Sequence, residues 1–173
     1  MSEKTPLQKL YQAVDSGEVT KARSMLAERP ELLHEDVIGG TWLHLAAEND
    51  DVPMAEMLAA AGLDVNGGKH FKPLTCAARN GAVHMARWLL DQGVDPNWDR
   101  MVIAAVNGGS PEVLRLLVEH GADVNATFKD ETAPGNPPMN ALSQAILHGR
   151  EDLESILREA GAAEPGAPER NSD

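Results

Sequence analysis

Histidine and cysteine are the residue types in this chain with the clearest potential for metal binding or catalysis. The six histidines are scattered along the sequence: His34, His44, His70, His84, His120 and His148. No two of them are four residues apart around a glutamate, the spacing that places two zinc ligands on one face of a helix. The single cysteine, Cys76, excludes an intramolecular disulfide and a tetrathiolate zinc site. We therefore predict no metal and no cofactor.

The other candidate catalytic groups lack the surroundings that catalysis requires. Cys76 precedes Ala77-Ala78, where small side chains predict tight packing and so a buried, inert thiol. A nucleophilic cysteine would need a base and an electropositive setting. Asp50-Asp51 and Glu35-Asp36 are paired only by adjacency, whereas acid–base catalysis needs two carboxylates that face one pocket in different environments.

A glycine-containing stretch, LDVNGGKH at residues 63–70, faintly resembles a phosphate-binding loop. It has Leu63 where such a loop needs its first glycine, and His70 where a hydroxyl residue should follow the lysine. We interpret the stretch as a turn. These results favour a protein that is not an enzyme, and an enzyme with an unrecognised site is the distant alternative.

Length and composition limit the possible folds and the possible partners of the chain. The 173 residues suit one domain or one short repeat array. Because aromatic residues make up only 3% of the chain, the core must consist of Ala, Leu, Val, Met and Ile. Asp and Glu number 27 against 15 Lys and Arg, which gives a net charge of −12. This charge opposes binding to nucleic acids and anionic membranes, and it would attract a basic protein.

No segment is suited to secretion or membrane insertion. Residues 1–22 lack the apolar core of a secretory signal. No window approaches the roughly 18 apolar residues of a membrane span. We therefore expect a soluble, cytoplasmic protein that is a monomer when free.

The elements that position these residues follow from an internal repeat. Copies align on a pair of small residues and a closing glycine, at 41–66, 72–97, 101–125 and 140–162, with a weaker copy at 10–33. The closing glycines Gly62, Gly93, Gly121 and Gly161 are separated by 31, 28 and 40 residues (93−62, 121−93 and 161−121). Each copy contains two short helical patterns, and the second has apolar residues at i, i+3 and i+4.

These copies carry a recognisable signature. The stretches TWLHLAA, KPLTCAA, LLDQGVDPN and LLVEHGADVN match a pattern that reads roughly T-P-L-H-x-A-A and then L-L-x-x-G-A-D-x-N. The chain thereby resembles the ankyrin repeat family over about residues 7–162. The resemblance implies an all-α solenoid of helix-turn-helix units with hairpin fingers, capped at both ends. We expect one domain over 1–162, with units at 7–33, 38–66, 70–97, 98–125 and 139–162, a long loop at 126–138 and a disordered tail at 163–173.

The resemblance assigns His44 to the scaffold, because the threonine and histidine of the signature hold the start of the inner helix by hydrogen bonds. Three departures from the family pattern stand out. Trp42 replaces the usual proline, Asn49-Asp50-Asp51 replaces an interhelical glycine, and Gly108-Gly109 adds about one residue to another interhelical turn.

Ankyrin proteins bind through their fingers and a concave groove, so the resemblance also suggests contact residues. Four of the six aromatic residues fall in or beside expected fingers, and interface hot spots favour Trp, Tyr and Arg. The predicted partner-binding residues are Ile38, Trp42, Glu48, His70, Phe71, Arg79, Trp98, Asp99, Arg100 and Phe128.

The expected function is noncatalytic protein–protein recognition. Small, acidic, stand-alone ankyrin proteins resemble bacterial immunity proteins that neutralise a toxin, often a basic one. We therefore expect a binder or inhibitor of a partner with a basic contact surface. A general regulatory adaptor or assembly subunit is the alternative.

Overall fold

The computed structural model describes residues 4–37, 40–67, 72–98, 100–128 and 138–165. Within them the chain forms ten α-helices and one short 3₁₀ helix. The elements are α1 (Pro6–Asp15), α2 (Val19–Glu28), η1 (Pro30–His34), α3 (Trp42–Glu48), α4 (Val52–Ala60), α5 (Pro73–Asn80), α6 (Val83–Asp91), α7 (Met101–Gly108), α8 (Pro111–Glu119), α9 (Ala141–Leu147) and α10 (Glu151–Glu159).

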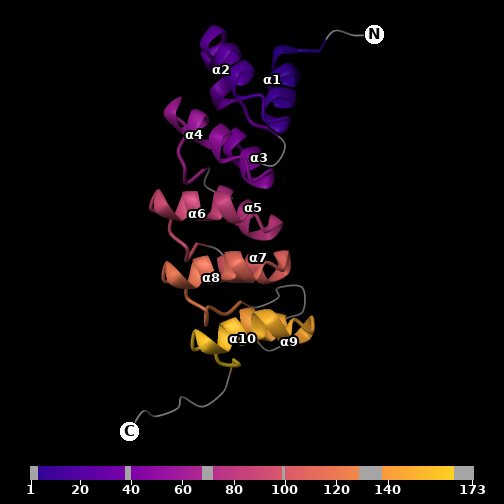
Figure 1. Ribbon diagram of the computed structural model, residues 1–173, viewed down its shortest axis with the longest axis vertical. Helices are drawn as coiled ribbons and strands as arrows, with labels where there is room; N and C mark the ends of the chain where they lie inside the picture. The colour runs from indigo at the N-terminus through magenta and orange to yellow at the C-terminus, as the bar shows by residue number, and fades with distance from the viewer. Residues whose placement is uncertain (1–3, 38–39, 68–71, 99, 129–137, 166–173) are drawn as a thin grey trace.

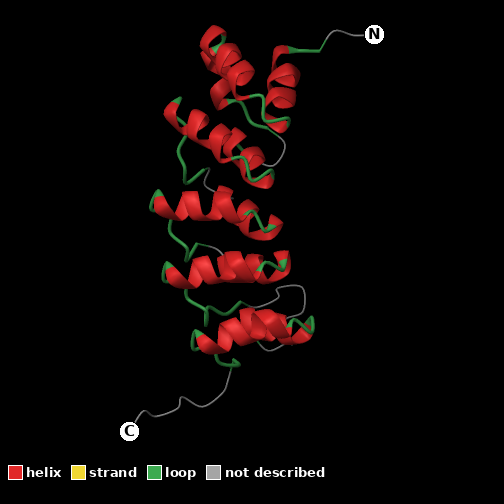
Figure 2. Ribbon diagram, viewed as in Figure 1, coloured by secondary structure: helices red, strands yellow, loops and turns green. Residues whose placement is uncertain are grey.

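The helices stack in pairs along one long axis, with the two ends of the chain at opposite ends of the stack (Figure 1). Odd-numbered helices lie on one side, which we call the inner-helix face, and even-numbered helices lie on the other. The described residues contain no strand (Figure 2), only isolated bridges that pair Val37 with Gly40 and Phe128 with Met139. The predicted all-α solenoid of helix-turn-helix units is confirmed.

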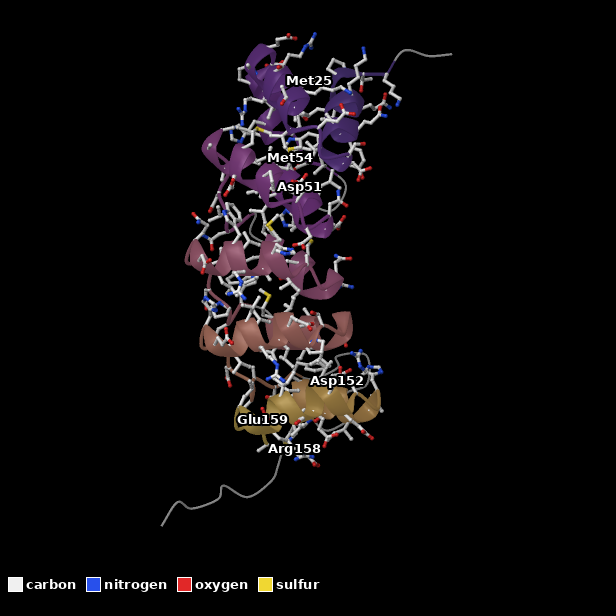
Figure 3. All side chains as sticks on the ribbon, in the orientation of Figure 1. Met25, Asp51, Met54, Asp152, Arg158 and Glu159 are labelled. Atoms are coloured by element: carbon white, nitrogen blue, oxygen red, sulfur yellow. The ribbon has the colours of Figure 1, made fainter. Side chains whose placement is uncertain are left out.

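Small and flexible apolar side chains fill the space between successive pairs (Figure 3). Ala46-Ala47 in α3 and Ala77-Ala78 in α5 are fully buried, which lets these inner helices approach closely. Met54 in α4 is fully buried, and Met25 in α2 is partly buried against the same core. Each pair therefore buries apolar surface against its neighbours, as expected of a repeat stack.

The turn inside each pair needs a left-handed backbone at one position. Glycine occupies it in four pairs, and Asp50 (φ 54°) occupies it in the pair α3–α4. In α7–α8 the residue at this position is Gly109 (φ 72°), and α7 ends at Gly108. The turn therefore has no extra residue, and the expectation of an insertion at Gly108-Gly109 is wrong. Gly108 is small for another reason: a Cβ there would lie 2.4 Å from the carbonyl oxygen of Ala78.

Asparagine side chains link successive pairs through backbone groups. Oδ1 of Asn97 accepts from the N–H of Asp123 at 2.7 Å, and its Nδ2 donates to the carbonyl of Gly121 at 3.3 Å. Asn125 repeats this arrangement one pair later, with the N–H of Ala163 (2.9 Å) and the carbonyl of Gly161 (3.2 Å). These bonds hold the spacing of the stack on the side of the closing glycines.

His44 belongs to this scaffold. Its Nδ1 accepts a hydrogen bond from the backbone N–H of Thr41 at 2.9 Å and lies 3.0 Å from the Thr41 hydroxyl. The residue is 4% exposed. It packs so closely against two loops that a Cβ at Gly40 would lie 2.6 Å from it, and one at Gly67 3.1 Å from it. The structural role expected for this histidine is confirmed.

Candidate protein-binding groove

The ten predicted contact residues fall into three groups. Ile38, His70, Phe71 and Asp99 lie outside the described residues. Trp42 is buried, whereas Glu48, Arg79, Trp98 and Arg100 are exposed and Phe128 is half-buried.

Trp42 is a core residue, so its assignment as a contact residue is wrong. Its side chain is 0% exposed, and its indole Nε1 donates to the carbonyl of Leu32 in η1 at 2.8 Å. The first position of α3 therefore directs this ring toward the preceding pair. A buried indole that satisfies its N–H in this way stabilises the packing of two units and is not available to a partner.

The position two residues before each interhelical left-handed turn residue changes in character along the stack. Equivalent residues, aligned on the left-handed turn position that follows, are Asp15, Glu48, Arg79, Asn107 and Leu147. All five are exposed. The inner-helix face thus passes from acidic side chains at α1 and α3 to a cation at α5 and to uncharged side chains at α7 and α9.

A groove of about 370 Å³ opens on this face where α5, α7 and α9 meet. It brings together three predicted residues, Arg79, Arg100 and Phe128, which lie up to 49 positions apart in sequence (128−79). We call it the arginine groove, and its lining is Thr75, Arg79, Arg100, Ile103, Ala104, Asn107, Phe128 and Gln144.

Arg100 is positioned by backbone and ring together. It is the residue that precedes α7, and it adopts a left-handed conformation (φ 57°) that residues other than glycine rarely take. Its guanidinium carbon lies 4.8 Å from the centre of the Phe128 ring, within the range of a cation–π interaction.

The same arrangement occurs one pair earlier. Lys72, which precedes α5, places Nζ 4.6 Å from the centre of the Trp98 ring. Trp98 remains 40% exposed. The residue before an inner helix and the aromatic residue in the next loop therefore form two successive cation–π pairs along the edge of the stack.

The charge of the arginine groove is opposite to that of the chain as a whole. Its lining contains two arginines and no carboxylate. Among the described residues, neither Arg79 nor Arg100 has a carboxylate oxygen within the 4.0 Å of an ion pair. On the inner-helix face, α3, which precedes α5 in the stack, ends at the acidic residue Glu48.

Cys76, in α5, is buried and its thiol is unreactive. Burial, followed by the negative charge of Glu48, raises the pKa of the Cys76 thiol from 9.0 to about 12, against a smaller opposing effect of Arg79. The thiol lies 4.0 Å from a Glu48 carboxylate oxygen. A protonated, buried thiol of this kind is not a nucleophile at neutral pH.

Several residues at this surface were missed from sequence. The arginine groove is also lined by Thr75, Ile103, Ala104 and Gln144, and Lys72 pairs with Trp98. Gln144 could have been found by alignment, because it occupies the α9 position equivalent to Ala104, which also lines the groove. Nothing in the sequence pairs Lys72 with Trp98, since the two residues are 26 positions apart.

A second hollow of about 380 Å³ lies between α2, η1 and α4, away from the predicted contact residues. Its lining is mainly apolar, with Arg23 as the charged member. It contains none of the exposed aromatic residues or paired cations described above, so the arginine groove is the better candidate for recognition.

Within the described ranges, no three His, Cys, Asp or Glu side chains are grouped so that they could hold a metal ion. The part of the chain that the structure describes also contains no helix long and apolar enough to cross a membrane.

Comparison with known families matches residues 10–100 to a model of three ankyrin repeats, more than half of the 173 residues, and residues 101–129 to a further ankyrin repeat. The chain belongs to the ankyrin repeat family. Ankyrin repeats are noncatalytic protein–protein interaction modules whose stacked units present an extended binding surface.

Curated proteins from several organisms are similar to this chain. Human cyclin-dependent kinase 4 inhibitor B is 34% identical over 101 residues, which cover 56% of this chain and 69% of that protein. Zygote-specific protein 3 of Chlamydomonas reinhardtii is 31% identical over 127 residues, or 66% of this chain and 32% of that protein. Mouse ankyrin repeat and SOCS box protein 5 is 32% identical over 121 residues, or 66% and 37% of the two chains.

Proposed function

We propose that this ankyrin protein binds a partner protein through its inner-helix face, with the arginine groove at the centre of the contact. The observation that carries the proposal is the convergence of Arg79, Arg100 and Phe128 in one groove, with Trp98 exposed at the adjoining edge. Arginine and aromatic side chains are enriched among the residues that dominate binding energy at interfaces.

We further propose that binding inhibits the partner, as an immunity protein inhibits a toxin. The name of the human relative describes an inhibitor of cyclin-dependent kinase 4, so inhibition by this fold has a precedent. The net charge of −12 favours a partner whose surface is basic, because opposite charges steer association.

In this proposal the exposed predicted residues have different tasks. Trp98 and Phe128 are anchors, and Glu48 contributes to the acidic field that attracts the partner. Ile38, His70, Phe71 and Asp99, which lie outside the described residues, remain proposed contacts.

Site-specific photo-crosslinking tests the proposal. Benzoylphenylalanine replaces Asn107 in the arginine groove in one variant and Arg115, an exposed residue of outer helix α8, in the control variant. We expect one protein species to crosslink to the Asn107 variant in a lysate of the source organism, and not to the Arg115 variant. Crosslinks from the Arg115 variant alone would place the interface on the outer helices and overturn the proposal.

Kinetics with the purified partner then separate the two kinds of contact. Trp98→Ala should mainly raise the off-rate, because a buried anchor acts after the complex has formed. Glu48→Lys should mainly lower the on-rate, and it should do so less at high salt, where screening shortens the field to a few ångströms. Titration of this chain should abolish the partner's activity. An unchanged activity in the complex would identify an adaptor in place of an inhibitor.

A further inference from the structure

We infer that the arginine groove recognises a carboxylate of the partner, so that the bound segment carries at least one acidic side chain where it crosses α5 and α7. This inference rests on the proposed function and adds the chemistry of the bound group. It differs from the expectation based on the net charge of the chain, which by itself favours only basic residues on the partner.

The first argument is the distribution of charge. The chain carries 27 acidic residues against 15 basic ones, yet the lining of the groove has two arginines and no acidic residue. Both arginines are exposed, and no carboxylate of the described residues pairs with either of them. Two cations that line one groove of an acidic protein, without a carboxylate partner among the described residues, form a local site for an anion.

The second argument is the preorganisation of Arg100. The Phe128 ring, whose centre lies 4.8 Å from the guanidinium carbon, restrains the position of the Arg100 side chain, and the guanidinium N–H groups are the part that can bond a partner. The planar N–H fork of arginine matches the two oxygens of a carboxylate. The left-handed backbone of Arg100 is a strained conformation of the kind that concentrates at ligand-binding positions.

Groups next to the two arginines also favour an anion. Arg100 directly precedes α7, and its side chain gives the first turn of that helix no hydrogen-bond acceptor, so the positive end of the helix dipole is not neutralised by its own cap. Asn107 lines the same groove and has an amide that can donate to a carboxylate oxygen. Ile103 and Ala104 add apolar surface to the lining of the groove. Hydrogen bonds from these donors are stronger beside apolar surface than in water, because the local dielectric constant is lower.

Two electrostatic effects with opposite sign then act at different ranges. The acidic surface attracts a basic partner from a distance, whereas the arginine groove selects an acidic side chain of that partner on contact. A cognate partner therefore has a basic surface with an acidic residue at its centre, and a merely basic protein leaves the two arginines desolvated without a counter-ion. Unpaired charges of this kind penalise the wrong partner.

The test uses blocked peptides of six glutamates and of six glutamines, which differ in charge and little in shape. They are titrated at low salt into the labelled full-length protein, with the Nε–H signals of the arginines observed by NMR. We expect hexaglutamate to shift the signals of Arg79 and Arg100 in a saturable way and to leave Arg115 on α8 unshifted. Hexaglutamine should leave all three signals unshifted.

Matched variants make the test specific. Arg79→Gln should weaken hexaglutamate binding about tenfold, Arg79→Lys should retain most of it, and Arg115→Gln, which changes net charge equally, should leave it unchanged. Each variant is first shown to melt like the parent protein. Equal shifts with both peptides, or equal losses in Arg79→Gln and Arg115→Gln, would overturn the inference.

The peptide titration and the crosslinking experiment test the two proposals separately. Partner crosslinks at Asn107 without hexaglutamate binding would leave the protein-binding role intact and remove the carboxylate assignment. Hexaglutamate binding without partner crosslinks at Asn107 would retain the anion site and remove the proposed protein interface.

Discussion

Asp50, in the turn between α3 and α4, accepts a hydrogen bond from the backbone N–H of Met85 in α6 at 2.7 Å. Its second carboxylate oxygen lies 2.7 Å from Nδ1 of His84. The residue that precedes α6 is Ala82, whose side chain cannot cap the helix. Asp50 therefore supplies, from 35 residues away, the N-terminal cap that α6 lacks. It also occupies the left-handed position (φ 54°) that the other four pairs fill with glycine.

This double role predicts an order of stabilities at position 50. Asp50→Ala should lower the free energy of unfolding by about 2 kcal/mol, because it removes the cap and leaves a Cβ in a left-handed backbone. Asp50→Gly loses only the cap and should cost less, and Asp50→Asn, which keeps an acceptor oxygen, should cost least. Urea denaturation measures the order. Equal losses in the Ala and Gly variants would show that backbone strain at Asp50 is unimportant.

Truncation of Trp42 should destabilise the protein much more than truncation of Trp98. Trp42→Ala removes a fully buried ring and leaves the Leu32 carbonyl without its donor, so we expect a loss of about 3–5 kcal/mol in unfolding free energy. Trp98→Ala removes a partly exposed ring and one cation–π contact with Lys72, with a loss of about 1 kcal/mol or less. Thermal and urea denaturation compare them, and similar losses would contradict the placement of Trp42 in the core.

Gly108→Ala should destabilise the protein even though alanine is the better helix former. In an open helix the change would stabilise by about 0.5–1 kcal/mol. Here the new Cβ would lie 2.4 Å from the carbonyl oxygen of Ala78, so α5 and α7 must separate, at a cost of about 1–3 kcal/mol. Asn80→Ala, at the equivalent position of α5, is the control. It loses the hydrogen bond from Nδ2 to the Cys76 carbonyl at 2.9 Å but gains helix propensity, so it should change stability by about 1 kcal/mol or less. A stabilised Gly108→Ala variant would show that the two helices can separate freely.

Cys76 should be nearly inert to alkylation while the protein is folded. A pKa of about 12 in place of 9.0 lowers the thiolate fraction at pH 8 about a thousandfold, before any effect of access. Iodoacetamide should therefore modify the thiol slowly from pH 7 to 9 in buffer, and rapidly in urea. Removing the negative charge in Glu48→Gln lowers the pKa and should speed the native reaction, whereas Arg79→Gln should slow it. Equal rates in buffer and urea would contradict the buried position of the thiol.

The sequence by itself determined the fold class, because a repeat stack is built from interactions within a unit and between adjacent units. Small residues such as Ala77-Ala78 recur wherever inner helices approach. His44 could be placed from its motif alone, since its partner Thr41 is only three residues away. Repeated local patterns of this kind can be interpreted from the sequence alone, because they do not depend on contacts between distant residues.

Tertiary structure alone decided which side of a helix each unusual residue faces and which distant residues meet. Trp42 looked like a surface aromatic from its place before an inner helix, but the orientation of α3 directs it to Leu32 in the preceding pair. In the sequence Asp50 is one of three residues that replace an interhelical glycine, yet its contact with Met85 crosses from one unit to the next. The arginine groove exists because stacking brings Arg79 of α5 beside Arg100 and Phe128. Contacts between units depend on the rotation and spacing of whole helices, which the pattern of any single unit does not contain.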